Sequence, residues 1–244
     1  QCYQDCPYEA ITMVPNPDPE KSRPVALPDP NLCALCGICA GSCSELNIAP
    51  PEISGTFQME AARAFAANHP GKDAYVVMGC SSNFASRDGL SKSLLAEFSQ
   101  VADVRFYPIG CAGQLHPYVV RELLEHFAGI YIWICPEEAC ENREGPRMLE
   151  GRLLGRNLPS FNVRKKNRER VRIVGYTEGQ KERSLDNFKA FVEKKEYKDL
   201  LAKGLVQPTD MELFVCNVDG SELKQITNLG GANWAPFFHP GGEK

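Results

Sequence analysis

Residues 31–43 read NLCALCGICAGSC and space their four thiols as C-x2-C-x2-C-x3-C. Bacterial proteins use this spacing to bind iron–sulfur cubanes. The three thiolates of the tight loop converge on one cluster, whereas the fourth, after three spacers, belongs to a neighbouring cluster. The stretch therefore predicts an electron-carrying segment built around two clusters.

A second, partial copy of the motif lies upstream, where residues 2–7 read CYQDCP. Its two thiols match the third and fourth cysteines of the pattern, and in two-cluster ferredoxins the fourth cysteine completes the cluster of the other motif. Two ligands of the second cluster would then precede residue 1, and the chain, which opens with Gln rather than Met, is expected to be a fragment. The predicted [4Fe–4S] ligands are Cys6, Cys33, Cys36 and Cys39 for one cubane, and Cys2 and Cys43 for the second.

Two features depart from the strict ferredoxin pattern. Ser44 stands where proline usually follows the fourth cysteine, and a proline-rich insert from Met13 to Pro30 lengthens the segment between the motifs. Neither removes a ligand, so Ser44 is expected to change solvent access and reduction potential rather than binding. The alternative, a zinc knuckle, needs histidines or paired C-x2-C units at a wider separation.

The composition is that of an ordinary folded protein. The 244 residues are 43% hydrophobic and 24% charged, with a formal net charge of −4, so nucleic acid is not expected as the main partner. No apolar run of the sequence reaches the roughly 20 residues that a membrane helix needs. Eleven cysteines fit metal ligation in a reducing compartment, the cytoplasm, better than a secreted disulfide scaffold.

The sequence pattern changes after residues 49–51 to an alternation of strands and helices. A helix is predicted from about Thr56 to His69, and apolar strand signals then alternate with helical patterns. This alternation predicts a parallel sheet with right-handed crossovers. The predicted strands are 74–78, 104–107 and 129–134. One predicted helix spans 90–100, and a second carries on one face Val119, Val120, Leu123, Leu124 and Phe127. A third spans 185–195 and would pack on the sheet through Leu185, Phe188 and Val192.

Cysteines follow each predicted strand of this sheet. Cys80 follows the first strand, Cys111 the second and Cys135 the third, with Cys140 five residues further on. The carboxyl ends of parallel strands meet at one edge, where open α/β sheets bind their ligands. The four thiols therefore predict one iron–sulfur site. Three glycines would let backbone amides approach its sulfurs: Gly79, Gly110 and Gly113.

Residues 73–195 resemble the iron–sulfur delta subunit of methyl-viologen-reducing hydrogenase, the electron-entry partner of heterodisulfide reductase. The likeness rests on GC at 79–80, PIGCAG at 108–113 and CPEEACENREG at 135–145. It implies a [2Fe–2S] cluster held by Cys80, Cys111, Cys135 and Cys140. Relatives often carry extra cysteines beside the first of these, where this chain has Ser81, Ser82 and Phe84.

A ferredoxin module ahead of such a domain resembles fusions in which the flavin-bearing A subunit of heterodisulfide reductase, or its relatives in sulfate reducers, runs through two cubanes into the delta domain. This resemblance implies a flavoprotein partner, which would be the missing N-terminal part. It also implies a hydrogenase or formate dehydrogenase as electron donor and a heterodisulfide or quinone-linked reductase as acceptor. The chain itself is expected to transform no substrate.

Other interpretations of the strand-end cysteines stay open. Any one of them would also serve as a small apolar core residue. Cys135 and Cys140 would instead form a redox-active pair, although four spacers are not the thioredoxin-like spacing. The competing class of protein is a zinc-stabilised docking adaptor without a redox role.

Three groups of charged or titratable residues lie near these motifs. Glu137, Glu138 and Glu144 are expected to be docking or supporting charges, because no nucleophile–base pair accompanies them. His116 is expected to cap a helix or to add surface polarity, with a role beside the cluster as a lesser alternative. The basic run 164–172 lacks interleaved aromatics, so it predicts a solvated face, with the steering of an acidic partner as the functional alternative.

The tail has a different pattern. Residues 210–221 predict a strand and an Asp-Gly turn, and a second strand follows through Leu223 to Thr227. Together with residues 233–240 they resemble one repeat of a TolB-type β-propeller. A single blade cannot bury its faces, so we favour a join of foreign sequence over further blades beyond Lys244. Cys216 is then expected to be a core cysteine of a strand, not a ligand.

The predicted architecture is an α+β ferredoxin-like cluster domain followed by an α/β domain with a parallel sheet and a short β tail. Its predicted parts are a partial two-cluster domain over 1–50, a linker and helix over 51–72, the delta-type domain over 73–198 and the blade-like tail over 205–244. The predicted function is a relay of electrons between a [2Fe–2S] site and [4Fe–4S] clusters within an oxidoreductase complex.

Overall fold

The computed structural model describes residues 1–49, 51–81, 88–161, 169–175, 181–202, 214–215 and 224–225. Its backbone contacts divide the chain into a larger unit, Gln1–Val192, and a smaller one, Glu193–Lys244. The ten described cysteines all belong to the larger unit, and none of them forms a disulfide bond with another described cysteine. The candidate sites therefore lie within that unit.

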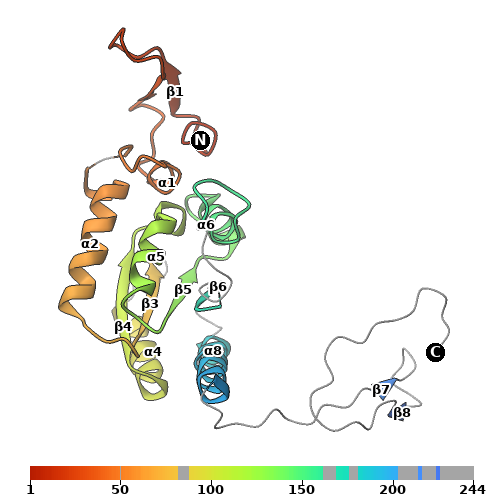
Figure 1. Ribbon diagram of the computed structural model, residues 1–244. Coiled ribbons are helices and arrows are strands. Elements are labelled where there is room, and N and C mark those ends of the chain that lie inside the picture. Colours follow the sequence, from red (N-terminus) through yellow and green to blue (C-terminus); the bar gives the residue numbers. More distant parts are fainter. Residues whose placement is uncertain are drawn as a thin grey trace, which may run out of the picture. The chain divides into compact units, whose positions relative to one another are not determined.

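A four-stranded parallel sheet forms the centre of the larger unit (Figure 1). Its strands are β3 (Tyr75–Cys80), β4 (Val104–Ile109), β5 (Gly129–Ile134) and β6 (Val171–Gly175), in the order β4-β3-β5-β6. β3 pairs with β4 on one side and with β5 on the other, so the strand order reverses between β3 and β5. Open α/β sheets bind ligands at such a switch point, outside the carboxyl ends of the strands. The predicted α/β domain with a parallel sheet is confirmed.

Helices cover both faces of the sheet, because β3 and β5 send apolar side chains alternately to two cores. On one face lie α2 (Gly55–Asn68), α5 (Pro117–Leu124) and α6 (Gly145–Leu153), and on the other lie α4 (Asp88–Val101) and α8 (Lys181–Ala202). The first core takes Val76, Met78, Ile130 and Ile132 from these strands, and the second takes Tyr75, Val77, Tyr131 and Trp133.

The helices match most of the sequence expectations. α2 begins where predicted because the hydroxyl of Ser54 accepts a hydrogen bond from the amide of Phe57 at 3.3 Å. The apolar face predicted around α5 is fully buried, and Phe188 of α8 is buried between α4 and the sheet. β6 and α6 were not predicted. Their sequences are short or weakly patterned, and the edge strand β6 contains only half-buried and exposed residues.

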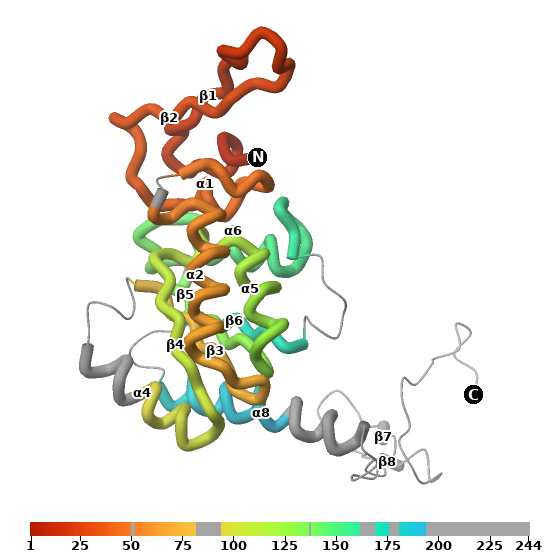
Figure 2. The backbone as a smooth tube through the Cα atoms, turned by 60° about the vertical axis from the view of Figure 1, so that its left-hand side comes forward, coloured from red at the N-terminus to blue at the C-terminus, as the bar shows by residue number. Residues whose placement is uncertain are grey.

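The N-terminal part of the larger unit is built around the cysteine motifs. An antiparallel hairpin, β1 (Ile11–Val14) with β2 (Val25–Pro28), occupies much of the proline-rich insert, and the short helix α1 (Ile38–Gly41) follows. The described part of the unit also contains three 3-10 turns, η1 (Pro51–Ile53), η2 (Ala112–Gln114) and η3 (Glu137–Ala139). α1 packs against η2 and α6, near the carboxyl ends of the strands of the sheet (Figure 2).

The smaller unit contains one short antiparallel pair, β7 (Phe214–Val215) with β8 (Lys224–Gln225). Both strands fall within the two strand segments predicted for the tail. Cys216, the predicted Asp-Gly turn and residues 233–240 lie outside the described residues. In the described part of the chain, no helix combines the length and apolarity needed to cross a membrane.

Candidate functional site

Four cysteines line one hollow in the N-terminal part of the larger unit. The cavity has a volume of about 500 Å3, and its wall contains the three cysteines of the tight loop and the cysteine assigned to them from the upstream motif. These residues, called the loop site below, are Cys6, Cys33, Cys36 and Cys39.

The chain turns sharply inside the loop site. Gly37, with φ at +74°, takes the left-handed conformation between Cys36 and α1. A side chain there would be strained and would also lie 3.0 Å from the side chain of Gln114. Glycine therefore lets Cys36 and Cys39 line the same cavity.

Backbone amides reach the sulfurs of the loop site. The amide of Ala10 donates to the Cys6 sulfur over 3.4 Å, and the amides of Ile38 and Ala40 bond to the thiols of Cys36 and Cys39. Such N–H···S bonds favour the thiolate and tune the potential of a bound cluster.

Two thiols of this site, those of Cys36 and Cys39, resist ionisation. Burial raises the pKa of Cys36 and raises that of Cys39 to about 12, and neighbouring thiols add to both shifts. A metal cation that binds such buried thiols favours their thiolate form. Metal binding here would therefore release protons.

Cys2 and Cys43, the pair predicted for a second cubane, lie near each other beside the loop site. Burial raises the pKa of the Cys2 thiol, and the thiol of Cys43 adds to that shift. Neither of these two residues lines the loop-site cavity.

A second group of cysteines lies at the carboxyl edge of the sheet. Cys80 ends β3, and Cys135 follows β5 directly. Their sulfurs are 3.6 Å apart, across the switch point of the sheet. Cys111, two residues past β4, forms a hydrogen bond with Cys80. The strand-end geometry predicted for these thiols is therefore present.

The last member of this group, Cys140, directly follows η3 and lies five residues before α6. A β-carbon at Gly145 would lie 2.9 Å from the sulfur of Cys111 and 3.3 Å from that of Cys140, so both sulfurs border the same glycine. All four thiols are therefore neighbours at one edge of the sheet. They are called the sheet-edge site: Cys80, Cys111, Cys135 and Cys140.

Polar groups surround the sheet-edge site. The hydrogen bond with Cys80 and burial raise the pKa of the Cys111 thiol, whereas the amide of Gly113 and the side chain of Asn142 bond to it and oppose that rise. Gly113 thus brings an amide to a sulfur as predicted. Gly110 acts differently, since its carbonyl oxygen accepts hydrogen bonds from Cys80 and Ser81. Asn142 and Gly145 had no predicted role, although both lie in the quoted 135–145 motif.

Tyr8 lies between the two sites. Its ring lines the loop-site cavity, and burial raises its pKa with contributions from Cys36 on one side and from Cys140 and Cys111 on the other. The guanidinium of Arg143 lies 5.5 Å from the centre of the ring. A single side chain therefore senses the charge of both cysteine groups.

His116 links the start of α5 to the backbone of the N-terminal cysteine motif. It is fully buried and is the N-cap of α5, where Nδ1 accepts a hydrogen bond from the amide of Tyr118. Its Nε2 lies 3.2 Å from the carbonyl oxygen of Cys43, so the neutral ring donates there. The predicted capping role is confirmed, and the alternative of surface polarity is wrong because the packing of α5 encloses the ring.

Stability should fall in mild acid because of His116. Burial lowers its pKa to about 4, so between pH 6.5 and 4 the unfolded chain binds a proton that the folded chain does not. The free energy of unfolding should drop by about 1 kcal/mol between pH 7.5 and 5.5 from this group. His116→Asn, which keeps a capping side chain, should lose this part of the drop in denaturant unfolding at the two pH values. An identical drop in the variant would contradict the assignment.

The other charged residues singled out in the sequence differ in their surroundings. Glu144 pairs with Arg147 at the surface, and Glu138 is exposed. The side chain of Glu137 lies outside the described residues, as do residues 164–168 of the basic run. Arg170, however, donates to the carbonyl oxygens of Leu124, Phe127 and Ala128, so for this residue a solvated face is the wrong prediction.

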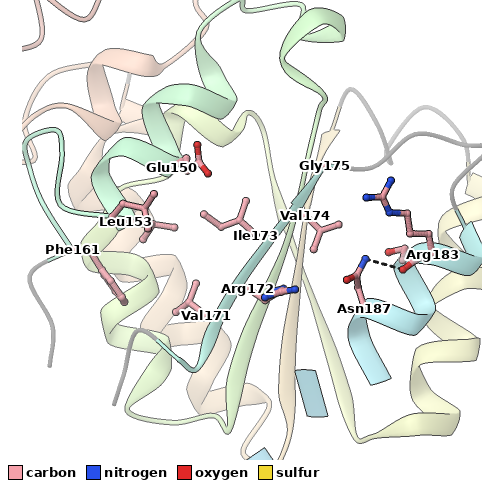
Figure 3. Close-up of a pocket in the computed structure, with 12 residues that line it drawn as sticks. Glu150, Leu153, Phe161, Val171, Arg172, Ile173, Val174, Gly175, Arg183 and Asn187 are labelled. Atoms are coloured by element: carbon pink, nitrogen blue, oxygen red, sulfur yellow. Dashed lines mark hydrogen bonds between the residues drawn. The ribbon is translucent and has the colours of Figure 1, made fainter. Parts of the chain in front are cut away.

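Another cavity, of about 570 Å3, lies beside the edge strand β6 (Figure 3). Its wall combines apolar side chains such as Leu153 and Ile173 with Arg172, Arg183 and Glu150. No cysteine lines it among the described residues. The segments that flank β6 on both sides lie outside the described part, so this cavity defines no site.

Comparison with known proteins adds no relative. The sequence matches no protein-family model and no curated protein. Among the described residues, no group of three or more Cys, His, Asp or Glu converges tightly enough to hold a single metal ion. A multi-iron cluster makes a different demand, because its thiolates are distributed over several irons rather than bound to one ion.

Proposed function

We propose that this chain relays single electrons between two iron–sulfur sites and transforms no substrate of its own. The observation that carries the proposal is the gathering of eight cysteines into two adjacent groups of four, the loop site and the sheet-edge site. When bound, the clusters would supply one-electron chemistry in which one site loses the electron that the other gains, with no bond made or broken.

The loop site fits a [4Fe–4S] cubane. Its cavity of about 500 Å3 has room for a group of several atoms, whereas a single water takes about 30 Å3 of liquid volume. Thiols are the donors that iron–sulfur clusters use, and backbone amides already point at three of them. Cys6, Cys33, Cys36 and Cys39 would hold the cubane.

The sheet-edge site fits a [2Fe–2S] cluster, the type that the resemblance implies. Two irons held by four cysteines call for two pairs of thiols. Cys80 and Cys135 form one close pair, and Cys111 and Cys140 both border Gly145. The Gly113 amide and Asn142 would tune the potential through their hydrogen bonds to Cys111.

The partners follow from the resemblance alone. They are a flavoprotein of the heterodisulfide reductase A type, a hydrogenase or formate dehydrogenase as donor, and a heterodisulfide or quinone-linked reductase as acceptor. A cytoplasmic location fits cysteines that form no disulfide bond among the described residues, and neither nucleic acid nor a membrane span is part of the proposal.

Metal and sulfide content test the function directly. Protein purified without oxygen should contain about six irons per chain, four from a cubane and two from a [2Fe–2S] cluster, with a similar amount of acid-labile sulfide. Its visible absorption should bleach with dithionite. Stoichiometric zinc, without sulfide or bleaching, would replace the relay with the docking adaptor.

One distance favours a second candidate, thiol–disulfide chemistry at the sheet edge. Cys80 and Cys135 have the close sulfurs, rather than the predicted Cys135 and Cys140. Such a pair would pass two electrons and two protons to a disulfide partner as the Cys80–Cys135 bond forms, or take them from a dithiol partner as that bond breaks. Peptide mapping of protein that lacks iron in this site would find that disulfide, whereas the relay requires iron there.

A further inference from the structure

A fully buried arginine lies where the two cysteine sites meet. Arg152, in the last turn of α6, has no exposed surface. Its Nη1 donates to the carbonyl oxygen of Gly113 over 2.7 Å, two residues past Cys111. Its Nη2 donates to the hydroxyl of Ser42 over 2.5 Å, next to Cys43. One guanidinium therefore binds the backbone of the sheet-edge site and the loop that carries the N-terminal cysteines.

This cation is only partly balanced. A carboxylate oxygen of Asp5, the neighbour of Cys6, lies 3.6 Å from Nη2 and accepts a hydrogen bond from Ser42 at 2.7 Å. Nε of Arg152 has no hydrogen-bond partner among the described residues. Burying a charge with incomplete pairing costs free energy, so its presence calls for a compensating role.

The backbone around Arg152 is shaped to admit it. A β-carbon at Gly41 would collide with Nη1 of Arg152 and with the carbonyl oxygen of Gly113. A β-carbon at Gly113 would lie 2.8 Å from both Gly145 and Ile38. Glycines on α1, η2 and α6 therefore allow the close approach that brings the guanidinium between the sites.

We propose that Arg152 is a positioning residue that couples the two cysteine sites electrostatically, as a buried positive charge shared by both. The inference rests on the proposed function. A cluster held by four thiolates carries net negative charge and gains more on reduction, so a buried cation near both sites raises both reduction potentials. Burial lowers the pKa of Arg152 to about 10, with Asp5, Cys111 and Cys39 opposing the shift, which leaves the guanidinium charged at neutral pH.

Potential measurements on three variants test this role. In redox titrations followed by EPR, Arg152→Met should lower the reduction potential of each cluster by about 59 mV or more. For one electron, this corresponds to a tenfold or larger change in the equilibrium constant of reduction. Asp5→Asn removes the opposing negative charge and should raise both. Arg156→Met, four residues further on at an exposed position, is the matched control and should move neither.

Potential shifts of opposite sign in Arg152→Met and Asp5→Asn would distinguish an electrostatic role from a structural one. Loosened packing alone would shift both buried variants in the same direction, and that result would overturn the inference, as would clusters with unchanged potentials. If Arg152→Met fails to fold, Asp5→Asn decides: a tenfold rise supports the coupling, and no change overturns it. Wild-type protein without iron–sulfur signals would instead refute the proposed function, so the two failures are distinguishable.

Discussion

Replacing Cys36 by serine should remove one low-potential signal from the EPR spectrum of the reduced protein and leave the signal of the sheet-edge site. Cys36 lines the loop-site cavity and its thiol is close to those of Cys6 and Cys33, so the cubane would lose one of its four ligands. Iron content should fall by up to about four atoms per chain, the size of a cubane.

Cys6→Ser should give the same loss, although Cys6 is 27 residues away from the nearest cysteine of the tight loop. The matched control is Cys2→Ser, which removes a nearby thiol that does not line the cavity. If Cys6→Ser left the cubane signal intact while Cys36→Ser removed it, the ligation across the two motifs would be wrong.

The second large effect is expected at the sheet edge. Cys111→Ser should abolish the [2Fe–2S] signal and spare the cubane, because Cys111 bonds to Cys80 and borders Cys140. Adding a single methyl group beside the sulfurs, by the change Gly145→Ala, should also remove most of the [2Fe–2S] signal. The β-carbon of the new alanine would lie 2.9 Å from the sulfur of Cys111. Because this contact is too short, either the sulfur or the start of α6 must shift.

Gly175→Ala is the control for the added methyl group, because a β-carbon at this position of β6 meets no atom of the described residues within 4 Å. We expect it to keep both signals, while Gly145→Ala loses most of the sheet-edge signal. Equal spectra for the two alanine variants would show that the sulfurs do not need the space beside Gly145.

Local patterns predicted much of this arrangement. The cysteine spacing in residues 33–39 is a property of a few consecutive residues. The three apolar strands place Cys80, Cys111 and Cys135 at one edge because the carboxyl ends of parallel strands lie together. Those parts depend little on contacts between distant segments. The iron itself, and the ferredoxin-like character of residues 1–50, stay predictions.

What the sequence did not predict depends on distant contacts. Arg152 and Ser42 are 110 positions apart, and nothing in the pattern of α6 distinguishes a buried arginine from an exposed one. The same holds for Arg170, whose place in a basic run predicted a solvated face although its guanidinium binds the end of α5. Long cationic side chains follow their partners, and partners are set by the tertiary fold.

Anomalous X-ray diffraction at the iron edge, on crystals of the anaerobically purified chain, tests the central claim most directly. The account predicts two iron peaks, one in the cavity lined by Cys6, Cys33, Cys36 and Cys39, and one at the carboxyl edge of the sheet among Cys80, Cys111, Cys135 and Cys140. A zinc edge in place of the iron edge, or a Cys80–Cys135 disulfide with no iron beside it, would contradict the relay.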